Sequence, residues 1–221
     1  MSDITVAMDA FGGDNAPDEV IKGAEQAVKA YGVGIILCGD ENKIKERMKA
    51  LGISENNITV RNADGVIKIE DNPTDIRKSK LNSSMGTAFQ LVKNGEADAF
   101  ISAGSTAALV VGGTTLIGRI KGVKRPSLAP IIPSVNQSYI LLDGGANVEC
   151  RPEMLAQFAV MGSVYMDKIM NVQSPRVGLL NVGTEDEKGR ELELEAHKLL
   201  SEGPVNFTGN IEGREAVLGG C

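Results

Sequence analysis

Short runs of apolar residues alternate along the chain with longer segments in which apolar residues recur every three or four positions. The short runs suit buried strands and the longer segments suit amphipathic helices, so the alternation predicts an α/β fold with a mainly parallel, open, twisted sheet flanked by helices. The predicted strands are Ile4–Met8, Gly34–Cys38, Ile58–Arg61, Ala99–Ser102, Tyr139–Leu142, Val177–Asn181 and Val205–Phe207. The predicted helices are Pro17–Tyr31, Glu41–Leu51, Ser84–Lys93, Thr106–Ile120, Pro152–Ile169 and Lys188–Leu200.

The alternation is interrupted in two places. Residues 65–82 are polar and mixed in charge, and Asn72-Pro73 breaks any pattern, so we expect an exposed excursion from the sheet. Ala99–Gly118 carries no charge and has the length of a membrane span, but its glycines, serines and threonines divide it into a short strand, a glycine turn and a helix. The 221 residues are enough for one good core, and we expect a single α/β domain over 1–221.

Charge and cysteine usage narrow the classes of function. The 23 Lys and Arg against 29 Asp and Glu give a net charge of −6, which argues against nucleic acid binding over the whole surface. Any anion site must therefore be local. The three cysteines have no C-x-x-C spacing, and the N-terminus lacks the features of a secretory signal. A reducing cytoplasm is the expected location.

Sequences rich in glycine and small polar residues follow most of the predicted strands, at the edge where ligands bind in open parallel sheets. Small residues let a ligand approach the backbone, and a following helix directs free N–H groups at an anion. Each such sequence alone is also typical of a tight turn between strand and helix. Together they predict a phosphate or carboxylate site. They are residues 9–17, 39–40, 102–106, 143–147, 181–185 and 208–210.

Common catalytic and nucleotide signatures are missing. No G-x-G-x-x-G follows the first strand, and residues 113–120 lack the Lys-Ser/Thr pair of a P-loop, so ATP and NAD are not indicated. The one histidine, His197, lies in an acidic predicted helix, which leaves little material for a Ser-His-Asp or Cys-His mechanism. An enzyme whose nucleophile is inorganic phosphate fits this lack, because phosphate is already ionised and needs positioning and charge control instead of a base.

Two cationic features could supply that charge. Four positive charges fall within seven residues, at Arg119, Lys121, Lys124 and Arg125, and Lys188 follows the acidic sequence 183–187. The alternative for the basic run is a solvated helix end that complements its own dipole. The alternative for Lys188 is a local ion pair near the start of the next helix.

Eight motifs occur along the chain in a fixed order, and in this order the chain resembles the acyl carrier protein-dependent phosphate acyltransferase family, called PlsX, of bacterial phospholipid synthesis. Each motif alone is a modest signal. They are Met8–Pro17, Ser83–Met85, Ile101–Leu109, Gly118–Pro130, Leu141–Val148, Met161–Tyr165, Arg176–Glu185 and Gly209–Glu212.

The resemblance implies transfer of a fatty acyl group from acyl carrier protein to inorganic phosphate, which yields acyl phosphate for a membrane glycerol-phosphate acyltransferase. It also implies a homodimer without metal or redox cofactor, in the cytoplasm with peripheral attraction to the membrane. The fold implied is akin to those of isopropylmalate dehydrogenases and phosphotransacetylases. The family continues beyond the point where this sequence ends at Cys221, so we expect a C-terminally truncated protein.

The loops that follow the strands suggest a mechanism. Lys188 is expected to neutralise phosphate, and donors at Asn181 and Thr184 to stabilise the oxyanion formed at the thioester carbonyl. The basic run 119–125 is the candidate contact for the acidic carrier protein. The predicted phosphate- and substrate-binding residues are Gly12, Gly13, Asn15, Gly104, Ser105, Thr106, Asp143, Asn147 and Gly183, with Asp9, Asp14 and Asp143 as candidates for ordering the loops.

Three other functions stay open at this point. A phosphotransacetylase-like enzyme would use an acyl coenzyme A with the same loops. A non-catalytic scaffold would keep the sheet but lack a completed cleft. A hydride-transferring dehydrogenase could be built on the same fold.

Overall fold

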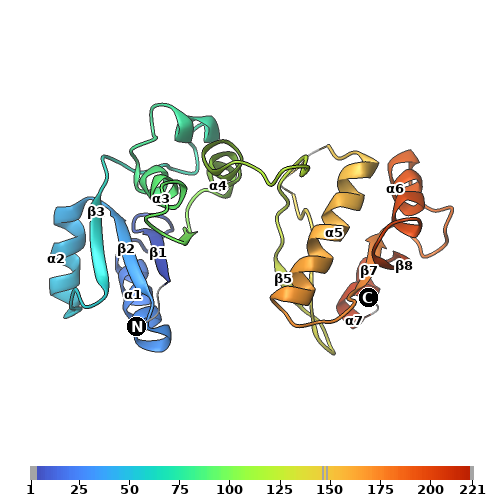
Figure 1. Ribbon diagram of the computed structural model, residues 1–221, viewed down its shortest axis with the longest axis horizontal. Helices are drawn as coiled ribbons and strands as arrows, with labels where there is room; N and C mark the ends of the chain where they lie inside the picture. Colours follow the sequence, from blue (N-terminus) through green and yellow to red (C-terminus); the bar gives the residue numbers. More distant parts are fainter. Residues whose placement is uncertain (1–3, 146, 148, 220–221) are drawn as a thin grey trace. The chain divides into compact units, whose positions relative to one another are not determined.

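The computed structural model describes residues 4–145, 147 and 149–219. The chain divides into two compact units, Met1–Ile120 and Lys121–Cys221, and each has a hydrophobic core of its own. Figure 1 shows the elements of both units in chain order. The single domain predicted over residues 1–221 stays a prediction.

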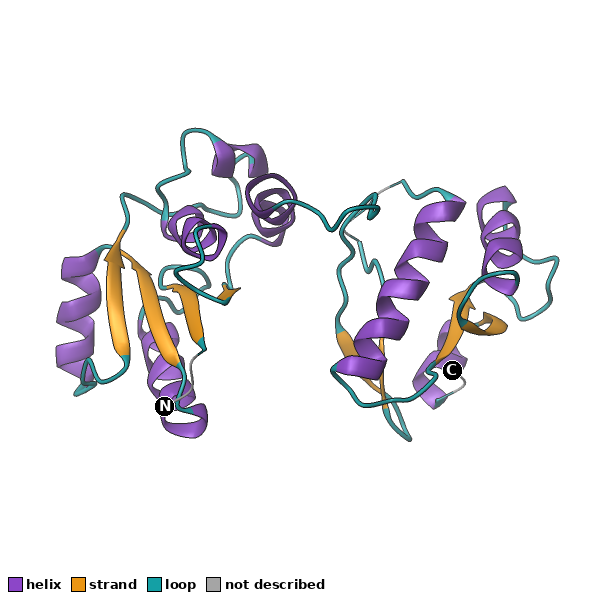
Figure 2. Ribbon diagram, viewed as in Figure 1, coloured by secondary structure: helices purple, strands orange, loops and turns teal. Residues whose placement is uncertain are grey.

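The first unit is built on a four-stranded parallel sheet in the order β3-β2-β1-β4 (Figure 2). β1 pairs with β2 on one side and with β4 on the other, so the direction of winding reverses at β1. Ligands of open α/β sheets bind outside the carboxyl ends of the strands at such a switch point. The strands are β1 (Thr5–Asp9), β2 (Gly34–Gly39), β3 (Ile58–Asn62) and β4 (Ala99–Ile101).

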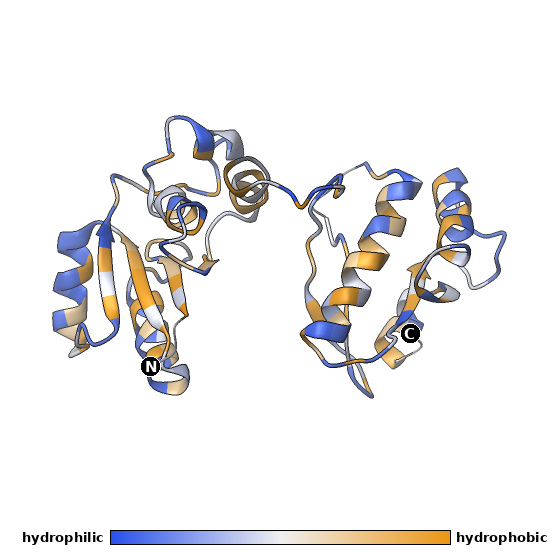
Figure 3. Cartoon of the chain, in the orientation of Figure 1, coloured by the Kyte–Doolittle hydropathy of each residue, from blue (hydrophilic) through white to orange (hydrophobic). Residues whose placement is uncertain are grey.

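Helices cover both faces of this sheet. Ile35 and Leu37 of β2 pack in one cluster with α1 (Asp18–Tyr31) and α2 (Glu41–Leu51). Cys38, on the opposite face of the same strand, packs with α3 (Ser84–Lys93). In Figure 3 the strands are largely hydrophobic whereas α2 is mostly hydrophilic, as expected for a sheet enclosed between layers of amphipathic helices.

Residues 65–82 contain one short 3-10 helix, η1 (Pro73–Arg77), and most of their side chains are exposed or half-buried. Ile67 and Ile76 are buried in a cluster with Met85 and Phe89 of α3. The segment is therefore fixed to the first unit through two isoleucines, while its polar side chains face solvent.

The uncharged stretch from residue 99 to 118 forms β4, a turn, α4 (Thr106–Gly112) and a π-helical turn η2 (Gly113–Ile117), which matches the predicted strand, turn and helix. The predicted helix Thr106–Ile120 is three residues too long, because Gly118 takes a φ of +96° that ends the helix. Within the described part of the chain, no helix is both long and apolar enough to cross a membrane.

The second unit combines two small sheets with three helices. β5 (Ile131–Pro133) and β6 (Ser138–Ile140) form an antiparallel hairpin, and β7 (Arg176–Leu180) and β8 (Asn206–Ile211) pair in parallel. α6 (Glu191–Ser201) connects β7 to β8. α5 (Pro152–Lys168) packs against α6, and α7 (Gly213–Leu218) follows β8. The core is formed by Ala159, Leu179, Ala196 and Leu200.

The α/β fold with a mainly parallel sheet flanked by helices is thus confirmed. The two largest boundary differences in the second unit are at α6 and at the last predicted strand. α6 begins at Glu191 instead of Lys188, because Gly189 has a φ of +98° that an α-helix does not contain. The last predicted strand, Val205–Phe207, continues to Ile211 through a register shift.

Candidate functional site

In the first unit, the loops that follow β1 and β4 are joined by a buried carboxylate. Asp9 is 2% exposed, and the Oδ2 atom of its side chain accepts a hydrogen bond of 2.7 Å from the hydroxyl of Ser102. The Ser102 oxygen in turn accepts a 3.0 Å bond from the backbone N–H of Gly104. This chain of bonds fixes both loops at the switch point of the sheet.

The approach of these loops leaves no room for larger residues. A Cβ atom on Gly12 would lie 2.6 Å from Oδ2 of Asp9 and 2.9 Å from the backbone nitrogen of Gly104. Gly13 has a φ of +102°, which L side chains rarely adopt. The loops of Gly12, Gly13 and Gly104 are therefore close together, with the carboxylate of Asp9 packed against Gly12 and Gly104.

The N-terminus of α4 borders the same region. Ser105 is 7% exposed and its Oγ accepts a 3.4 Å bond from the N–H of Ala108, so its hydroxyl serves as the helix cap. Thr106 is exposed. Asn15 is also exposed, in the loop between β1 and α1.

In the second unit, the loop after β6 is organised around Asp143, which has a φ of +62°. Asn147 donates through Nδ2 to Oδ1 of Asp143 at 2.9 Å and to the carbonyl oxygen of Pro126 at 3.2 Å. The thiol of Cys150 donates to Oδ2 of Asp143 at 3.2 Å. Asp143 and Asn147 therefore interact mainly with each other and with their own loop.

Cys150 is a poor nucleophile in this setting. Burial, the hydrogen bond to Asp143 and the negative charge of that residue together raise the pKa of its thiol to about 11, with burial as the largest cause. The nearby Arg125 opposes the shift without cancelling it. Because the thiolate is the reactive form, a covalent acyl intermediate on Cys150 is disfavoured near neutral pH.

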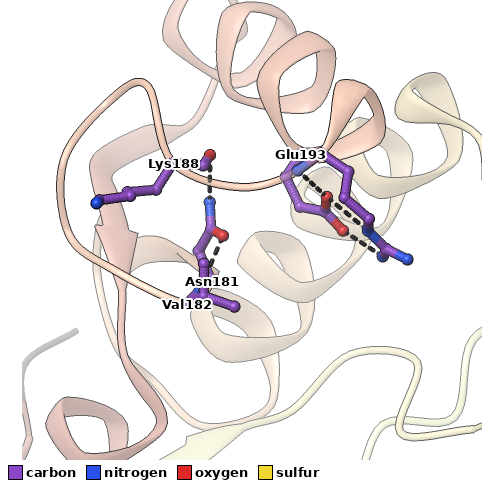
Figure 4. A network of polar contacts seen from close by, with 5 residues as sticks. Asn181, Val182, Lys188 and Glu193 are labelled. Atoms are coloured by element: carbon purple, nitrogen blue, oxygen red, sulfur yellow. Dashed lines mark hydrogen bonds and ion pairs between the residues drawn. The ribbon is translucent and has the colours of Figure 1, made fainter.

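The loop between β7 and α6 carries the predicted residues Asn181, Gly183, Thr184 and Lys188 close together. Figure 4 shows that Asn181 closes this loop: its Nδ2 donates to the carbonyl oxygen of Lys188 at 3.0 Å, and its Oδ1 accepts from the N–H of Val182 at 2.8 Å. A Cβ atom on Gly189 would lie 2.9 Å from Oδ1 of Asn181, so glycine is required for the closure.

The side chain of Lys188 points away from Asn181 in Figure 4. Its Nζ lies 3.9 Å from Oε1 of Glu185, and the two side chains are 50% and 61% exposed. An ion pair this long and this exposed contributes little. Thr184 is exposed as well. The loop thus presents an accessible ammonium group and a hydroxyl on a backbone that is held in place.

The end of the loop is tied to the start of α6. The backbone N–H of Arg190 donates to Oε2 of Glu193 at 2.8 Å, and Nη2 of Arg190 donates to Oε1 at 2.7 Å. The hydrogen bond from Arg190 lowers the pKa of Glu193 below its usual value, so this carboxylate stays charged at neutral pH.

Asn210 is not among the predicted site residues, although it ends the sequence 208–210 that was predicted as one of the loops. Asn210 is 5% exposed, and its Nδ2 donates to the carbonyl oxygen of Glu185, in the middle of the loop, at 2.7 Å. The sequence 208–210 is predicted as a loop after a strand, whereas these residues lie within β8. The signal that could have identified Asn210 as a site residue is its position beside Gly209 near the end of a strand.

His197 lies near the same loop without joining it. Its ring contacts Phe207 edge-on, with centroids 5.0 Å apart, and Nε2 lies 3.3 Å from Oδ1 of Asp186 in an arrangement that forms no hydrogen bond. Its side chain is 17% exposed. Among the described residues, no group of three or more His, Cys, Asp or Glu side chains is placed to hold a metal ion.

The second unit also contains a largely apolar cavity of about 560 Å³. α5 contributes Phe158 and Met166, β6 contributes Ile140, and β7 contributes Leu179. The polar side chains of Asp143, Asn147 and Glu193 also reach it, and its volume is within the range of small-molecule pockets.

The four cations of the basic run are exposed, and they fall after the end of η2 instead of on a helix. Arg119 belongs to the first unit and Lys121, Lys124 and Arg125 to the second. Gln157 of α5 holds the part of the basic run that lies in the second unit. Its side chain accepts from the N–H of Lys124 at 2.8 Å and donates to the carbonyl oxygen of Gly122 at 2.9 Å.

Solved structures support the fold. The chain is similar to a phosphotransacetylase from Streptococcus pyogenes, with a TM-score of 0.73 and 19% identity over 95% of this chain and 68% of that one. It is also similar to the EutD phosphotransacetylase from Staphylococcus aureus, with a TM-score of 0.69 and 21% identity over the same shares. At these identities the likeness concerns the fold alone.

Sequence relatives are closer. The phosphate acyltransferases of Clostridium acetobutylicum and Desulforamulus reducens are 45% and 44% identical over 215 and 220 residues. These matches cover 97% and 98% of this chain, which spans 65% of the length of each relative. The family model described as fatty acid synthesis protein matches residues 4–220. The chain therefore belongs to the fatty acid synthesis protein family, in which its relatives are phosphate acyltransferases.

Proposed function

We propose that this chain takes part in transferring a fatty acyl group from acyl carrier protein to inorganic phosphate, with acyl phosphate as the product. The observation that carries the proposal is the β7–α6 loop, in which an accessible Lys188 stands on a backbone fixed by Asn181. The names of the relatives support the same reaction class.

Phosphate binds at this loop, with its charge balanced by the ammonium group of Lys188. Such a contact holds the nucleophile in place and removes part of the repulsion between phosphate and the developing oxyanion. Gly183 and Thr184 contribute backbone N–H groups, and Thr184 contributes its hydroxyl. The amide nitrogen of Asn181 has two N–H donors. One donates to the carbonyl oxygen of Lys188, and the other remains to donate to the oxyanion.

The transfer needs no covalent enzyme intermediate. A phosphate oxygen attacks the thioester carbonyl carbon, the resulting oxyanion collapses, and the C–S bond breaks as the carrier leaves as a thiolate that takes up a proton from water. The raised pKa of Cys150 is in keeping with this direct route.

Within the first unit, the loops after β1 and β4 are a further candidate for binding substrate. Backbone N–H groups near Gly12, Gly13, Gly104 and Thr106 are the donors, while Asp9 and Ser105 order the loops from within. In the second unit, Asp143 and Asn147 order the loop after β6. Asn15 is the remaining polar candidate on the β1–α1 loop.

The carrier protein docks on the basic run 119–125. Opposite charge raises the rate of encounter without demanding high affinity, so added salt weakens the contact. The protein acts in the cytoplasm as a homodimer, peripherally associated with the membrane where a glycerol-phosphate acyltransferase consumes the acyl phosphate.

The direct test is to trap acyl phosphate with hydroxylamine. The chain is assayed beside a chimera that adds the portion of the Clostridium acetobutylicum relative that it does not match, with acyl carrier protein and coenzyme A thioesters at equal concentration. We expect phosphate-dependent acyl hydroxamate in at least the chimera, and faster from the carrier protein thioester. Faster reaction with the coenzyme A thioester would favour the phosphotransacetylase-like alternative, and no hydroxamate from either protein would contradict acyl transfer.

A further inference from the structure

The amide of Asn210 supports the loop that carries Lys188, although the two residues lie 22 positions apart in the sequence. Its Nδ2 donates to the carbonyl oxygen of Glu185 at 2.7 Å. The backbone N–H of Lys188 donates to that same oxygen at 3.1 Å. One carbonyl group thus links the buried asparagine to the backbone of the lysine.

Lys188 is held from its other side by Asn181, which donates to its carbonyl oxygen at 3.0 Å. Its N–H and its C=O are therefore both tied, one through Glu185 to Asn210 and the other to Asn181. The ammonium group of Lys188 makes a long ion pair of 3.9 Å with Glu185, which restrains the side chain little. A fixed backbone with an unrestrained ammonium group is the arrangement expected of a lysine that binds an anion from solution.

A β-bulge places Asn210 where it can make this contact. Phe207 pairs with Val177, but Asn210 pairs with Leu179, so Thr208 and Gly209 stand against Gly178 alone. Gly209 has a φ of +97°, which permits the extra residue. Without the bulge, Asn210 would pair with Leu180, which is 50% exposed, instead of with the buried Leu179.

The position is unfavourable for an amide. Asn210 is 5% exposed, and its Oδ1 is buried without a hydrogen-bond partner among the described residues. An unsatisfied buried acceptor lowers stability, and such groups in native proteins require an explanation. The hydrogen bond to Glu185 supplies the explanation, because the NH₂ group of the Asn210 amide makes it while the oxygen of that amide stays without a partner.

We propose that Asn210 is a positioning residue for Lys188: through the carbonyl of Glu185 it sets the place of the lysine at which phosphate binds. This inference rests on the proposed function for the role of phosphate. The hydrogen-bonded support of the loop does not depend on that function and can be tested separately.

Two substitutions separate positioning from a structural role. Asn210→Leu has nearly the same shape and removes both the donor and the unsatisfied oxygen, while Glu185 keeps its bond from Lys188. It should leave the melting temperature unchanged or raise it. Asn210→Asp keeps the size but turns an acceptor toward the carbonyl of Glu185, and it serves if the leucine variant does not fold.

Asn206→Ala is the matched control. Asn206 lies at the other end of the same strand and also donates through Nδ2 to a backbone carbonyl, that of Ser174, at 3.0 Å. Among the described residues its side chain makes no hydrogen bond to the loop 181–190, so its loss should affect neither that loop nor phosphate binding. If the substitutions act by weakening β8 as a whole, the variants at Asn206 and at Asn210 should show the same losses.

The experiment measures two quantities in the complete chain by NMR: amide hydrogen exchange of residues 183–188, and the dissociation constant for inorganic phosphate from the shift of the Lys188 amide. With Asn210→Leu we expect faster exchange in the loop and phosphate affinity reduced roughly tenfold or more, at an unchanged or raised melting temperature. Asn206→Ala should match the unsubstituted chain in both.

Three results would overturn the inference. Unchanged loop exchange in both Asn210 variants would show that the asparagine does not support the loop. Faster exchange with unchanged phosphate affinity would show that the support does not position Lys188. A lowered melting temperature with losses shared by Asn206→Ala would assign a purely structural role. If the unsubstituted chain itself shows no phosphate response, the proposed function fails, and loop exchange alone then decides the support by Asn210.

Discussion

The glycine-rich loops at the switch point of the first unit and the β7–α6 loop of the second resemble each other in composition but differ in the use of their charged groups. In the first unit the charge is a carboxylate, Asp9, buried and bonded to Ser102. In the second unit the loop carries exposed carboxylates in residues 185–187, and it also presents an ammonium group, Lys188, which is half exposed and weakly paired. Loops of this kind can therefore either pack around a carboxylate or present a cation to solvent. Of the two, the cation of Lys188 offers a full positive charge to phosphate.

The two units differ in packing as well. The first encloses a four-stranded sheet between helices, whereas the second has two two-stranded sheets and a cavity of about 560 Å³. Two-stranded sheets gain less from pairing. The loop of Lys188 follows a strand of a two-stranded sheet, whereas the loops at the switch point follow strands of the four-stranded sheet; side-chain hydrogen bonds hold both.

The largest expected effect is the loss of the cation. Lys188→Met in the chimera that forms acyl phosphate should reduce turnover about 10²- to 10³-fold, because a charge opposite the reacting phosphate disappears. The melting temperature should stay the same, since the ion pair with Glu185 is long and exposed.

The control for that substitution is Lys22→Met. Lys22 pairs with Glu19 on α1 at 2.7 Å and its side chain is 44% exposed, similar to Lys188. It should keep full turnover. Equal turnover in the two variants would remove Lys188 from the reaction and with it the contrast between the loops.

The second effect concerns the close packing around Asp9. Gly12→Ala should lower the free energy of unfolding by roughly 1–3 kcal/mol, because the new Cβ would overlap the Asp9 side chain and the Gly104 backbone. Urea unfolding measures the change. Gly23→Ala is the matched control: no atom lies within 4 Å of its added Cβ, and alanine should stabilise α1 by about 0.5–1 kcal/mol. A Gly12 variant as stable as the Gly23 variant would contradict the packing described for the switch point.

A smaller effect is expected at the basic run. Charge reversal at Lys121 and Lys124 should slow association with acyl carrier protein roughly tenfold at low salt, because steering by opposite charge is lost. Stopped-flow measurement over a range of ionic strength gives the rate, and the difference should shrink as salt is added. Association rates that respond neither to the reversal nor to salt would assign the run a structural role.

The smallest effect concerns the reactivity of Cys150. Its pKa is raised to about 11, so only about 1% is thiolate at pH 9 and alkylation should be slow. Asp143→Asn removes a negative charge that disfavours the thiolate, so the pKa should fall and alkylation at pH 9 should rise several-fold. Peptide mapping by mass spectrometry follows the site, and Cys38, whose pKa is raised to about 12 by burial, serves as an unreactive internal standard. An unchanged rate at Cys150 would show that burial alone controls this thiol.

The sequence was sufficient for the elements that have a clear period. β2 and α2 lie where the alternation of apolar residues predicts them, and α3 has the predicted bounds. The helical segment formed by α4 and η2 ends three residues earlier than predicted, and α6 begins three residues later, because a positive φ at Gly118 or Gly189, and not hydrophobic periodicity, decides these positions. β5 and α7 were missed because segments of three and six residues show too little of either period.

The candidate site shows a similar division. The residues of the β7–α6 loop are contiguous, so one motif was enough to group them. Residues 208–210 were predicted as a loop at the same edge of the sheet, but the contact of Asn210 with Glu185 could not be predicted, because it depends on a bulge in β8 that shifts the register by one residue. The burial of Asp9 against Gly12 was also beyond the sequence, since it depends on the pairing of β1 with β4 across more than 90 residues.

The most direct test of the central claim, that phosphate binds at the loop of Lys188, is calorimetric titration of the 221-residue chain with inorganic phosphate. Unsubstituted chain and Lys22→Met should bind phosphate with the same saturable isotherm, and Lys188→Met should bind it at least tenfold more weakly. Equal binding by Lys188→Met and the unsubstituted chain would contradict the account.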